Sequence, residues 1–268
     1  AFRNLDAPGA PMSIRLIRSV VDSLRRSFAP RPRFRRPSGW WILDRVFQLR
    51  RQLEELENRV VPATVTWTGA GDGIDWHSGA NWDLGAPTSA DDVVVPIGFS
   101  ASTIEIPFGL ASALTLNSYA AITVQNGGVL WIASTTGLSE FHGEFQMVTG
   151  GSFTSDSEVR FNADASVEGV FSGGGDFVSN AKFEIVGNTT LPGSMRSDGT
   201  FHILSDTTIV PGGATLELNG AATLEGNAFL QLDGLLDNSS NFTILRSLNG
   251  AAIQGTGTIL NSGNLQQD

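Results

Sequence analysis

The stretch F-E-I-V-G-N-T-T-L-P-G at residues 183–193 is followed by a near copy, F-H-I-L-S-D-T-T-I-V-P-G, at residues 201–212. Each copy begins by alternating apolar and polar residues, which is typical of a short β-strand with one buried face. The Pro-Gly pairs near the ends of the two copies are 19 residues apart. A repeat of this length indicates one coil of a solenoid whose strands pair with the coils before and after it.

The same alternation recurs along residues 99–268, and no helical pattern of useful length interrupts it. The strands that it predicts most clearly are 103–106, 113–116, 121–124, 129–132, 182–185, 200–203, 215–218 and 229–232. Gly and Asn recur at the strand ends, where sharp corners need left-handed backbone geometry. We therefore expect an all-β fold, a parallel β-solenoid (right-handed β-helix) with coils of about 20 residues. A β-sandwich, which also consists of short strands and frequent turns, is the alternative.

Charge divides the chain near residue 62. Residues 1–62 hold 13 of the 17 Lys and Arg but 6 of the 27 Asp and Glu, whereas residues 63–268 hold 4 basic and 21 acidic residues. A basic arm on an acidic body suggests a targeting segment, or an arm that contacts an anionic partner such as a membrane surface, a cell-wall polymer or nucleic acid. We expect no specific nucleic acid partner. The absence of Cys excludes disulfides, Cys-ligated metals and a thiol nucleophile.

The basic arm itself predicts two amphipathic helices separated by the Pro/Arg-rich linker 29–37. Their apolar residues recur at spacings of three and four, which places them on one helical face. The two stripes are Ile14, Ile17, Val21, Leu24 and Phe28, and Ile42, Val46, Leu49, Leu53 and Leu56. We interpret residues 1–62 as a sorting or attachment segment.

The phrase L-E-N-R-V-V-P at 56–62 resembles the L-E-[DN]-R-x-V-P motif of exported surface proteins of planctomycete bacteria. The matching residues are Leu56, Glu57, Asn58, Arg59, Val61 and Pro62. The phrase G-T-G-T-I-L-N-S-G at 255–263 similarly resembles parallel β-helix passengers and adhesins. These resemblances imply export and an extracellular or cell-surface location, and they imply no activity.

Both ends of the predicted solenoid core need a cover. Residues 63–98 contain Trp67, Trp76 and Trp82, and we expect this segment to cap the first coil with its three indoles. The solenoid itself is predicted over 99–268. It stops at residues 264–268 in the middle of a repeat phrase, so we expect a C-terminal truncation, with further coils or another chain stacking there.

Few residues suggest chemistry. The basic residues Arg160, Lys182, Arg196 and Arg246 are scattered without a local Asp or Glu companion pattern, so we predict that the protein is not an enzyme. A single imperfect copy of a Gly/Asp calcium-binding repeat at residues 69–75 makes Asp72 and Asp75 the candidate metal ligands, with Ca²⁺ as the ion. We otherwise expect no metal or cofactor. Six phenylalanines are expected to fill the interior: Phe141, Phe145, Phe153, Phe161, Phe171 and Phe177.

These observations predict a non-enzymatic, exported structural or adhesin-like surface segment. Its partners would be cell-surface or extracellular-matrix polymers. The alternative is a carbohydrate-active β-helix enzyme or a carbohydrate-binding module. A row of carboxylates on one solenoid face within ~10 Å, or a deep groove lined by aromatic residues, would favour that alternative.

Overall fold

The computed structural model describes residues 62–267, apart from residue 205 and residues 246–250. The chain divides into two compact units, Ala1–Val60 and Val61–Asp268. The helices predicted in the basic arm, and the motif residues 56–61, lie outside the described residues. Pro62, the last motif residue, is exposed and precedes the first strand.

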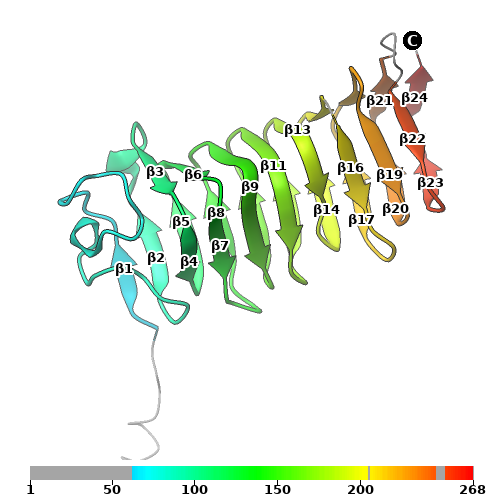
Figure 1. The fold of residues 1–268 in the computed structure, drawn as a ribbon. Helices are drawn as coiled ribbons and strands as arrows, with labels where there is room; N and C mark the ends of the chain where they lie inside the picture. Colours follow the sequence, from blue (N-terminus) through cyan, green and yellow to red (C-terminus); the bar gives the residue numbers. More distant parts are fainter. Residues whose placement is uncertain (1–61, 205, 246–250, 268) are drawn as a thin grey trace, which may run out of the picture. The chain divides into compact units, whose positions relative to one another are not determined.

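The second unit is a parallel β-solenoid, and every named strand pairs in parallel with its neighbours. This excludes the β-sandwich, whose sheets are antiparallel. The strands stack coil upon coil from β1 to β24 (Figure 1). One strand of each coil joins a ten-stranded sheet, and the rest of the coil joins a fourteen-stranded sheet with two lanes.

The ten-stranded sheet contains β1 (Thr64–Thr66), β2 (Asp92–Val95), β5 (Thr115–Ser118), β8 (Ser139–Phe141), β10 (Val159–Phe161), β12 (Asp176–Ser179), β14 (Ser194–Ser197), β17 (Thr215–Leu218), β20 (Leu235–Asn238) and β23 (Thr258–Asn261). The first lane of the other sheet contains β3 (Thr103–Ile106), β6 (Ala121–Val124), β9 (Phe145–Ser155), β11 (Ala165–Ser172), β13 (Phe183–Thr190), β15 (Phe201–Ile203), β18 (Ala222–Leu224), β21 (Asn241–Ile244) and β24 (Asn264–Gln267). The second lane contains β4 (Gly109–Ala113), β7 (Gly128–Ile132), β16 (Thr207–Val210), β19 (Phe229–Leu232) and β22 (Ala252–Gln254). The long strands β9, β11 and β13 run through both lanes.

The coil length agrees with the sequence repeat. From β2 onward, paired positions in the ten-stranded sheet lie from 18 residues apart, as for Phe177 and Met195, to 23 apart, as for Val93 and Leu116. The first pair of strands, β1 and β2, is 28 residues apart. The two copies of the repeated phrase stack directly, because Phe183 pairs with Phe201 and Thr189 with Thr208. The predicted coil of about 20 residues is therefore confirmed.

One predicted strand, 113–116, is wrong. β4 ends at Ala113 and β5 begins at Thr115, so the chain turns at Leu114. The Leu114 N–H donates to the Asp91 carbonyl at 2.7 Å, which fixes this corner to the preceding coil. Ala113 and Leu116 are both buried, but they belong to different strands, so the apparent alternation spans a corner.

Aromatic rings fill the middle of the core. All six phenylalanines predicted for the interior are buried, and Phe183 and Phe201 extend the same column. Phe141 stacks on its strand partner Phe161 (centroids 5.2 Å apart), and Phe183 stacks on its partner Phe201 (5.7 Å). Phe153 and Phe171, which also pair in register, meet edge-on at 5.6 Å. The register that aligns the strands therefore also aligns the rings.

Three indoles pack together near the N-terminal end of the solenoid. Trp67, Trp76 and Trp82 are each no more than 4% exposed. The Trp82 ring meets Trp67 and Trp76 edge-on, with centroids 4.8 and 4.9 Å apart, and its Nε1 donates to the Trp76 carbonyl at 2.8 Å. Residues 63–98 also contain β1 and β2, so the first rungs of the ten-stranded sheet lie within the segment predicted as a cap. At the opposite end, β23 and β24 are exposed along their length.

Candidate functional site

The Gly/Asp-rich loop at residues 69–83 is organised by Asn81, whose side chain is fully buried. Its Oδ1 accepts from the N–H groups of Gly71 and Gly73, both at 2.9 Å. Its Nδ2 donates to Asp72 Oδ1 at 2.7 Å and to the Asp75 carbonyl at 2.9 Å. Sequence reasoning singled out the aspartates here and missed Asn81, because a buried amide that bonds backbone groups has no motif of its own.

The two candidate metal ligands, Asp72 and Asp75, lie in this loop, where their carboxylates accept hydrogen bonds from backbone N–H groups. Asp72 Oδ1 accepts hydrogen bonds from the backbone N–H groups of Ile74 and Asp75 and from the Asn81 side chain. Asp75 Oδ1 accepts one from the backbone N–H of His77 at 2.9 Å. Within residues 62–267, where placed, no group of three or more His, Cys, Asp or Glu is arranged to hold a metal ion. Calcium binding by these two residues stays a prediction.

The hydrogen bonds to Asp72 make the loop sensitive to acid. The Asn81 side chain, followed by the Ile74 and Asp75 N–H groups, lowers the pKa of Asp72 below its ordinary 3.8. Because the pKa of Asp72 is lower in the folded chain than in the unfolded chain, its ionised carboxylate stabilises the fold at pH values above the unfolded pKa. This stabilisation is lost as the pH falls through the pKa of the folded state. We expect the tryptophan fluorescence of the cap to change as the pH falls below about 4. Asp72→Asn should remove this acid-induced change in fluorescence.

The matched control is Asp176→Asn, because the exposed Asp176 carboxylate accepts no hydrogen bond from a described residue. This variant should keep the acid transition of the unmodified chain. An identical acid titration in Asp72→Asn would contradict the role given to Asp72.

Two of the basic residues lie close together in space, and all three described ones have acidic partners, contrary to the sequence prediction. Arg160 and Arg196 lie in one row on the outer face of the ten-stranded sheet, on either side of Val178. Arg160 pairs with Glu158 at 2.7 Å, Arg196 with Asp198 at 3.1 Å, and Lys182 with Glu184 at 3.1 Å. Each partner is two residues away in sequence, and such residues share a face of a strand. The prediction that they lack acidic companions is therefore wrong, and Arg246 lies outside the described residues.

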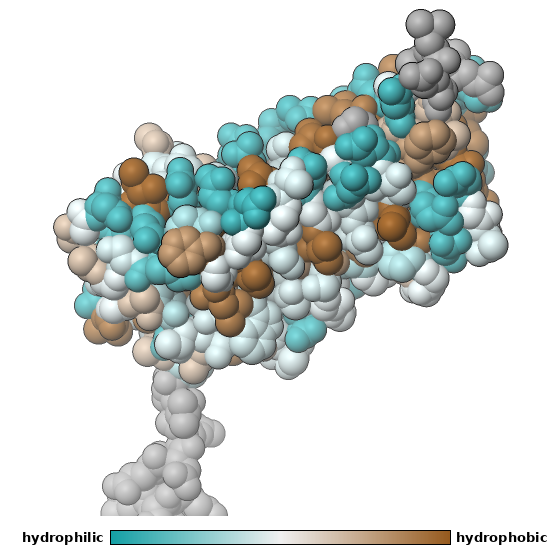
Figure 2. Space-filling view, in the orientation of Figure 1, coloured by the Kyte–Doolittle hydropathy of each residue, from teal (hydrophilic) through white to brown (hydrophobic). Residues whose placement is uncertain are grey.

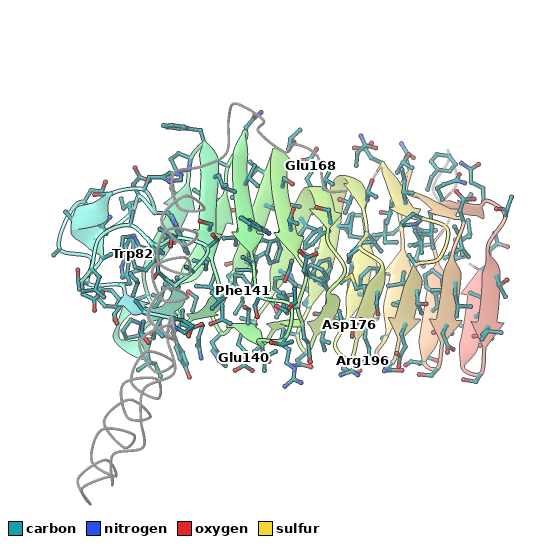
Figure 3. The ribbon with its side chains drawn as sticks, turned by 90° about the horizontal axis from the view of Figure 1, so that it is seen from below. Trp82, Glu140, Phe141, Glu168, Asp176 and Arg196 are labelled. Carbon is teal, nitrogen blue, oxygen red and sulfur yellow. The ribbon has the colours of Figure 1, made fainter. Side chains whose placement is uncertain are left out.

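This charged face also carries Glu140, Asp176 and Glu217. Figure 3 shows Glu140, Asp176 and Arg196 along one side of the solenoid, while Glu168 lies on the opposite side. Val178 points outward from the core yet is only 4% exposed, because the long side chains of Arg160 and Arg196 flank it. The face is therefore covered by paired side chains rather than hollowed.

A hollow does form on the opposite side, at the corner between the two lanes of the fourteen-stranded sheet. Between the pairs Val167–Met147 and Gly169–Gly151, β11 has one residue, Glu168, where β9 has three. β11 is also shorter than β13 at this corner. Val167 pairs with Ile185 and Gly169 with Thr189, so Glu168 alone lies opposite the three residues 186–188. The corner of β11 is therefore recessed between two longer corners, 148–150 and 186–188.

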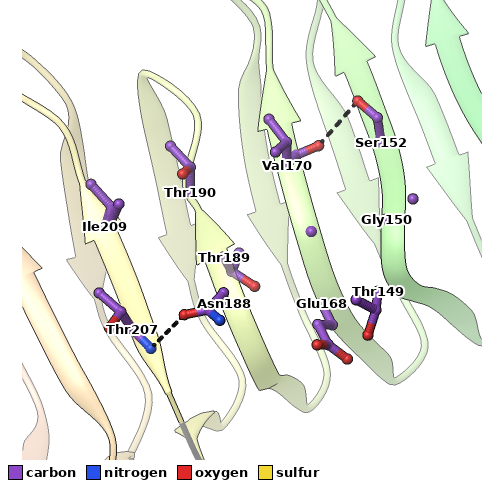
Figure 4. Close-up of a pocket in the computed structure, with 12 residues that line it drawn as sticks. Thr149, Gly150, Ser152, Glu168, Val170, Asn188, Thr189, Thr190, Thr207 and Ile209 are labelled. Carbon is purple, nitrogen blue, oxygen red and sulfur yellow. Dashed lines mark hydrogen bonds between the residues drawn. The ribbon is translucent and has the colours of Figure 1, made fainter. Parts of the chain in front are cut away.

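The recess opens into a groove of about 590 Å³ that crosses β9, β11, β13 and β16 (Figure 4). Hydroxyl, amide and apolar groups line it around the single carboxylate of Glu168. The lining side chains are Thr149, Ser152, Glu168, Val170, Asn188, Thr189, Thr190, Thr207 and Ile209. We call it the Glu168 groove.

Two features show how the groove is held in shape. A Cβ on Gly187 would overlap the Glu168 side chain, so glycine at this corner leaves room for the carboxylate to lie there. Asn188 Oδ1 accepts from the Thr207 N–H at 3.2 Å, which ties the wall of one coil to the next. The Glu168 carboxylate itself has no hydrogen-bond or ion-pair partner among the described residues. Sequence reasoning missed Glu168. The signal that could have identified it is a difference in spacing, because Val167 and Phe171 are closer in sequence than Met147 and Phe153, with which they pair.

No family model matches the chain, and neither the curated proteins nor the solved structures contain a significant match to it. The part of the chain that the structure describes has no helix of the length and apolar character needed to cross a membrane.

Proposed function

We propose that this chain is a non-enzymatic, adhesin-like structural segment of an exported surface protein. The observation that carries the proposal is the uninterrupted stack of coils around one continuous hydrophobic core. In such a stack each coil contacts only its neighbours, so the fold extends in one direction and presents long lateral faces. A spacer or adhesive stalk needs this geometry.

Side-chain ladders on the outside strengthen the stack. Asn180 Nδ2 donates to Asn162 Oδ1 of the preceding coil at 2.7 Å. Further on, Asn219 Nδ2 donates to Asp198 at 2.8 Å, and Ser239 Oγ donates to Asn219 at 2.8 Å. These bonds join successive coils at one corner, and they supplement the backbone ladder in resisting bending.

The surface supports an exposed location in solvent. In the view of Figure 2, hydrophobic residues form small groups that are separated by polar ones. Large contiguous apolar patches, which would mark an extensive buried interface, are absent from this view of the described residues. The resemblance of residues 56–62 to an export motif, together with the basic arm, supports export.

Fractionation of cells that express the full-length gene tests this function. We expect the protein in the surface fraction, where external protease digests it in intact cells. A chain lacking residues 12–62 should stay inside. Replacing Glu57 and Arg59 with Ala should mimic this deletion if the motif directs export, whereas the control Arg50→Ala and Arg51→Ala outside the motif should not. Protein confined to the cytoplasm would overturn the proposal.

A second candidate, carbohydrate hydrolysis, is favoured by one feature of the charged face. Glu158 directly precedes β10, and Asp176 directly precedes Phe177, which pairs with Val159, so the two carboxylates are at corresponding places of coils about 4.8 Å apart. Retaining glycosidases place two carboxyl groups about 5–5.5 Å apart. Release of reducing ends from a polysaccharide, lost in Asp176→Asn, would establish this activity; no release would leave the structural function as proposed.

A further inference from the structure

We propose that the Glu168 groove binds a saccharide that carries hydroxyl or ammonium groups and no acidic group. The inference deepens the proposed function, because it names the chemical class of polymer to which this solenoid adheres. It differs from the hydrolytic candidate because the groove lies on the other side of the solenoid from Asp176 (Figure 3).

The lining of the groove suits a sugar. Sugar rings present hydroxyl groups at their edges and C–H groups on their faces. The hydroxyls of Thr149, Ser152 and Thr207 can form hydrogen bonds with the sugar hydroxyl groups. The apolar side chains of Val170 and Ile209 can contact the C–H faces. Val170 is 48% exposed, so its apolar surface is open to a ligand. Binding sites of this kind combine an apolar lining with a small number of fixed polar groups.

The direction of the groove suits a chain rather than a single small molecule. Its lining comes from four successive coils, on β9, β11, β13 and β16. Neighbouring strands are about 4.8 Å apart, so the groove runs for about 15 Å across the strands. An oligosaccharide lying along the solenoid would meet equivalent positions of successive coils, such as Val170 and Thr190, which pair in register.

Charge selects the class of saccharide. Glu168 is the only charged residue among those that line the groove, and no described residue neutralises it. Residues 63–268 carry 21 acidic against 4 basic residues, so the potential around the groove is negative. A uronic acid polymer would be repelled. Hydroxyl or ammonium groups would donate to the half-buried carboxylate, and hydrogen bonds to charged acceptors are the stronger kind.

The test is calorimetric titration of the purified full chain with three tetrasaccharides, of glucosamine, of N-acetylglucosamine and of galacturonate. We expect the first or the second to bind and the galacturonate not to bind. If only the glucosamine tetrasaccharide binds, the group that donates to Glu168 is an ammonium group. If the glucosamine and N-acetylglucosamine tetrasaccharides both bind, the donors are hydroxyl groups. Glu168→Gln should weaken binding about tenfold. Val170→Trp, a change at an exposed position, should block the groove.

Asp237→Asn is the matched control, because Asp237 lies beside Glu217 on the ten-stranded sheet and has no side-chain hydrogen-bond or ion-pair partner among the described residues. The variant removes one carboxylate away from the groove and should leave the affinity unchanged. Melting temperatures of all variants should match that of the unmodified chain. The proposal is overturned if neither expected sugar binds, if galacturonate binds as well as they do, or if both groove variants retain full affinity. Equal weakening by Asp237→Asn and Glu168→Gln would also overturn it, because it would show attraction by overall charge. These results do not depend on cellular location, so this proposal can fail while the structural function stands.

Discussion

Replacing Trp82 with alanine is expected to unfold the N-terminal end of the solenoid. Trp82 packs edge-on against both Trp67 and Trp76 and is 4% exposed. Truncating a buried tryptophan to alanine costs about 3–5 kcal/mol, through lost contacts and the cavity that remains. The Trp76 carbonyl also loses the indole N–H that donates to it at 2.8 Å.

The loss should be local at first, because the stability of a solenoid is a sum over coils and their interfaces. Hydrogen–deuterium exchange should therefore show faster exchange in β1 and β2, while β14, β17 and β20 keep their protection. Thermal melting should begin at a lower temperature and should broaden.

Trp131→Ala is the matched control for this change. Trp131 lies on β7 with its side chain partly exposed and outside the core, so its loss should have a much smaller effect. Unchanged exchange in β1 and β2 of the Trp82→Ala protein would mean that the three indoles do not hold the first coils together.

The sequence was informative where a physical requirement recurs in every coil. Phe183 and Phe201 are in equivalent phrases because each coil must bury an inward residue at the same place, and the structure pairs them. The three tryptophans were similarly visible as large apolar residues in a segment otherwise rich in Gly and Asp. Their burial follows from the need to remove such surface from water.

The sequence was less informative where the structure depends on differences between coils. The Glu168 groove exists because β11 has a shorter corner than β9 and β13, and the difference has meaning only when the register is known. The face that holds Arg160 and Arg196 was missed for a related reason. Those residues are 36 apart in the chain, and the coil length places them in one row, two coils apart.

Replacing Phe153 with alanine should have the largest effect in the middle of the solenoid. Phe153 is fully buried in β9, and its ring lies within 6.3 Å, between centroids, of five other phenylalanine rings. The expected cost is about 3–5 kcal/mol. The rings that surround it come from three successive coils, at Phe141, Phe145, Phe161, Phe171 and Phe177. The cavity would therefore weaken several interfaces between coils at once.

This position distinguishes a continuous core from a set of independent coils. If the aromatic column couples the coils, Phe153→Ala should divide one unfolding transition in denaturant into two, because the N-terminal and C-terminal coils would lose their strongest common contact. Phe153→Leu, which keeps most of the volume, should restore much of the stability and the single transition. Phe108→Ala provides the control, because that ring is 70% exposed and its loss should change the midpoint little. A single transition at an unchanged midpoint in Phe153→Ala would show that hydrogen-bonded ladders, rather than the aromatic column, join the two halves.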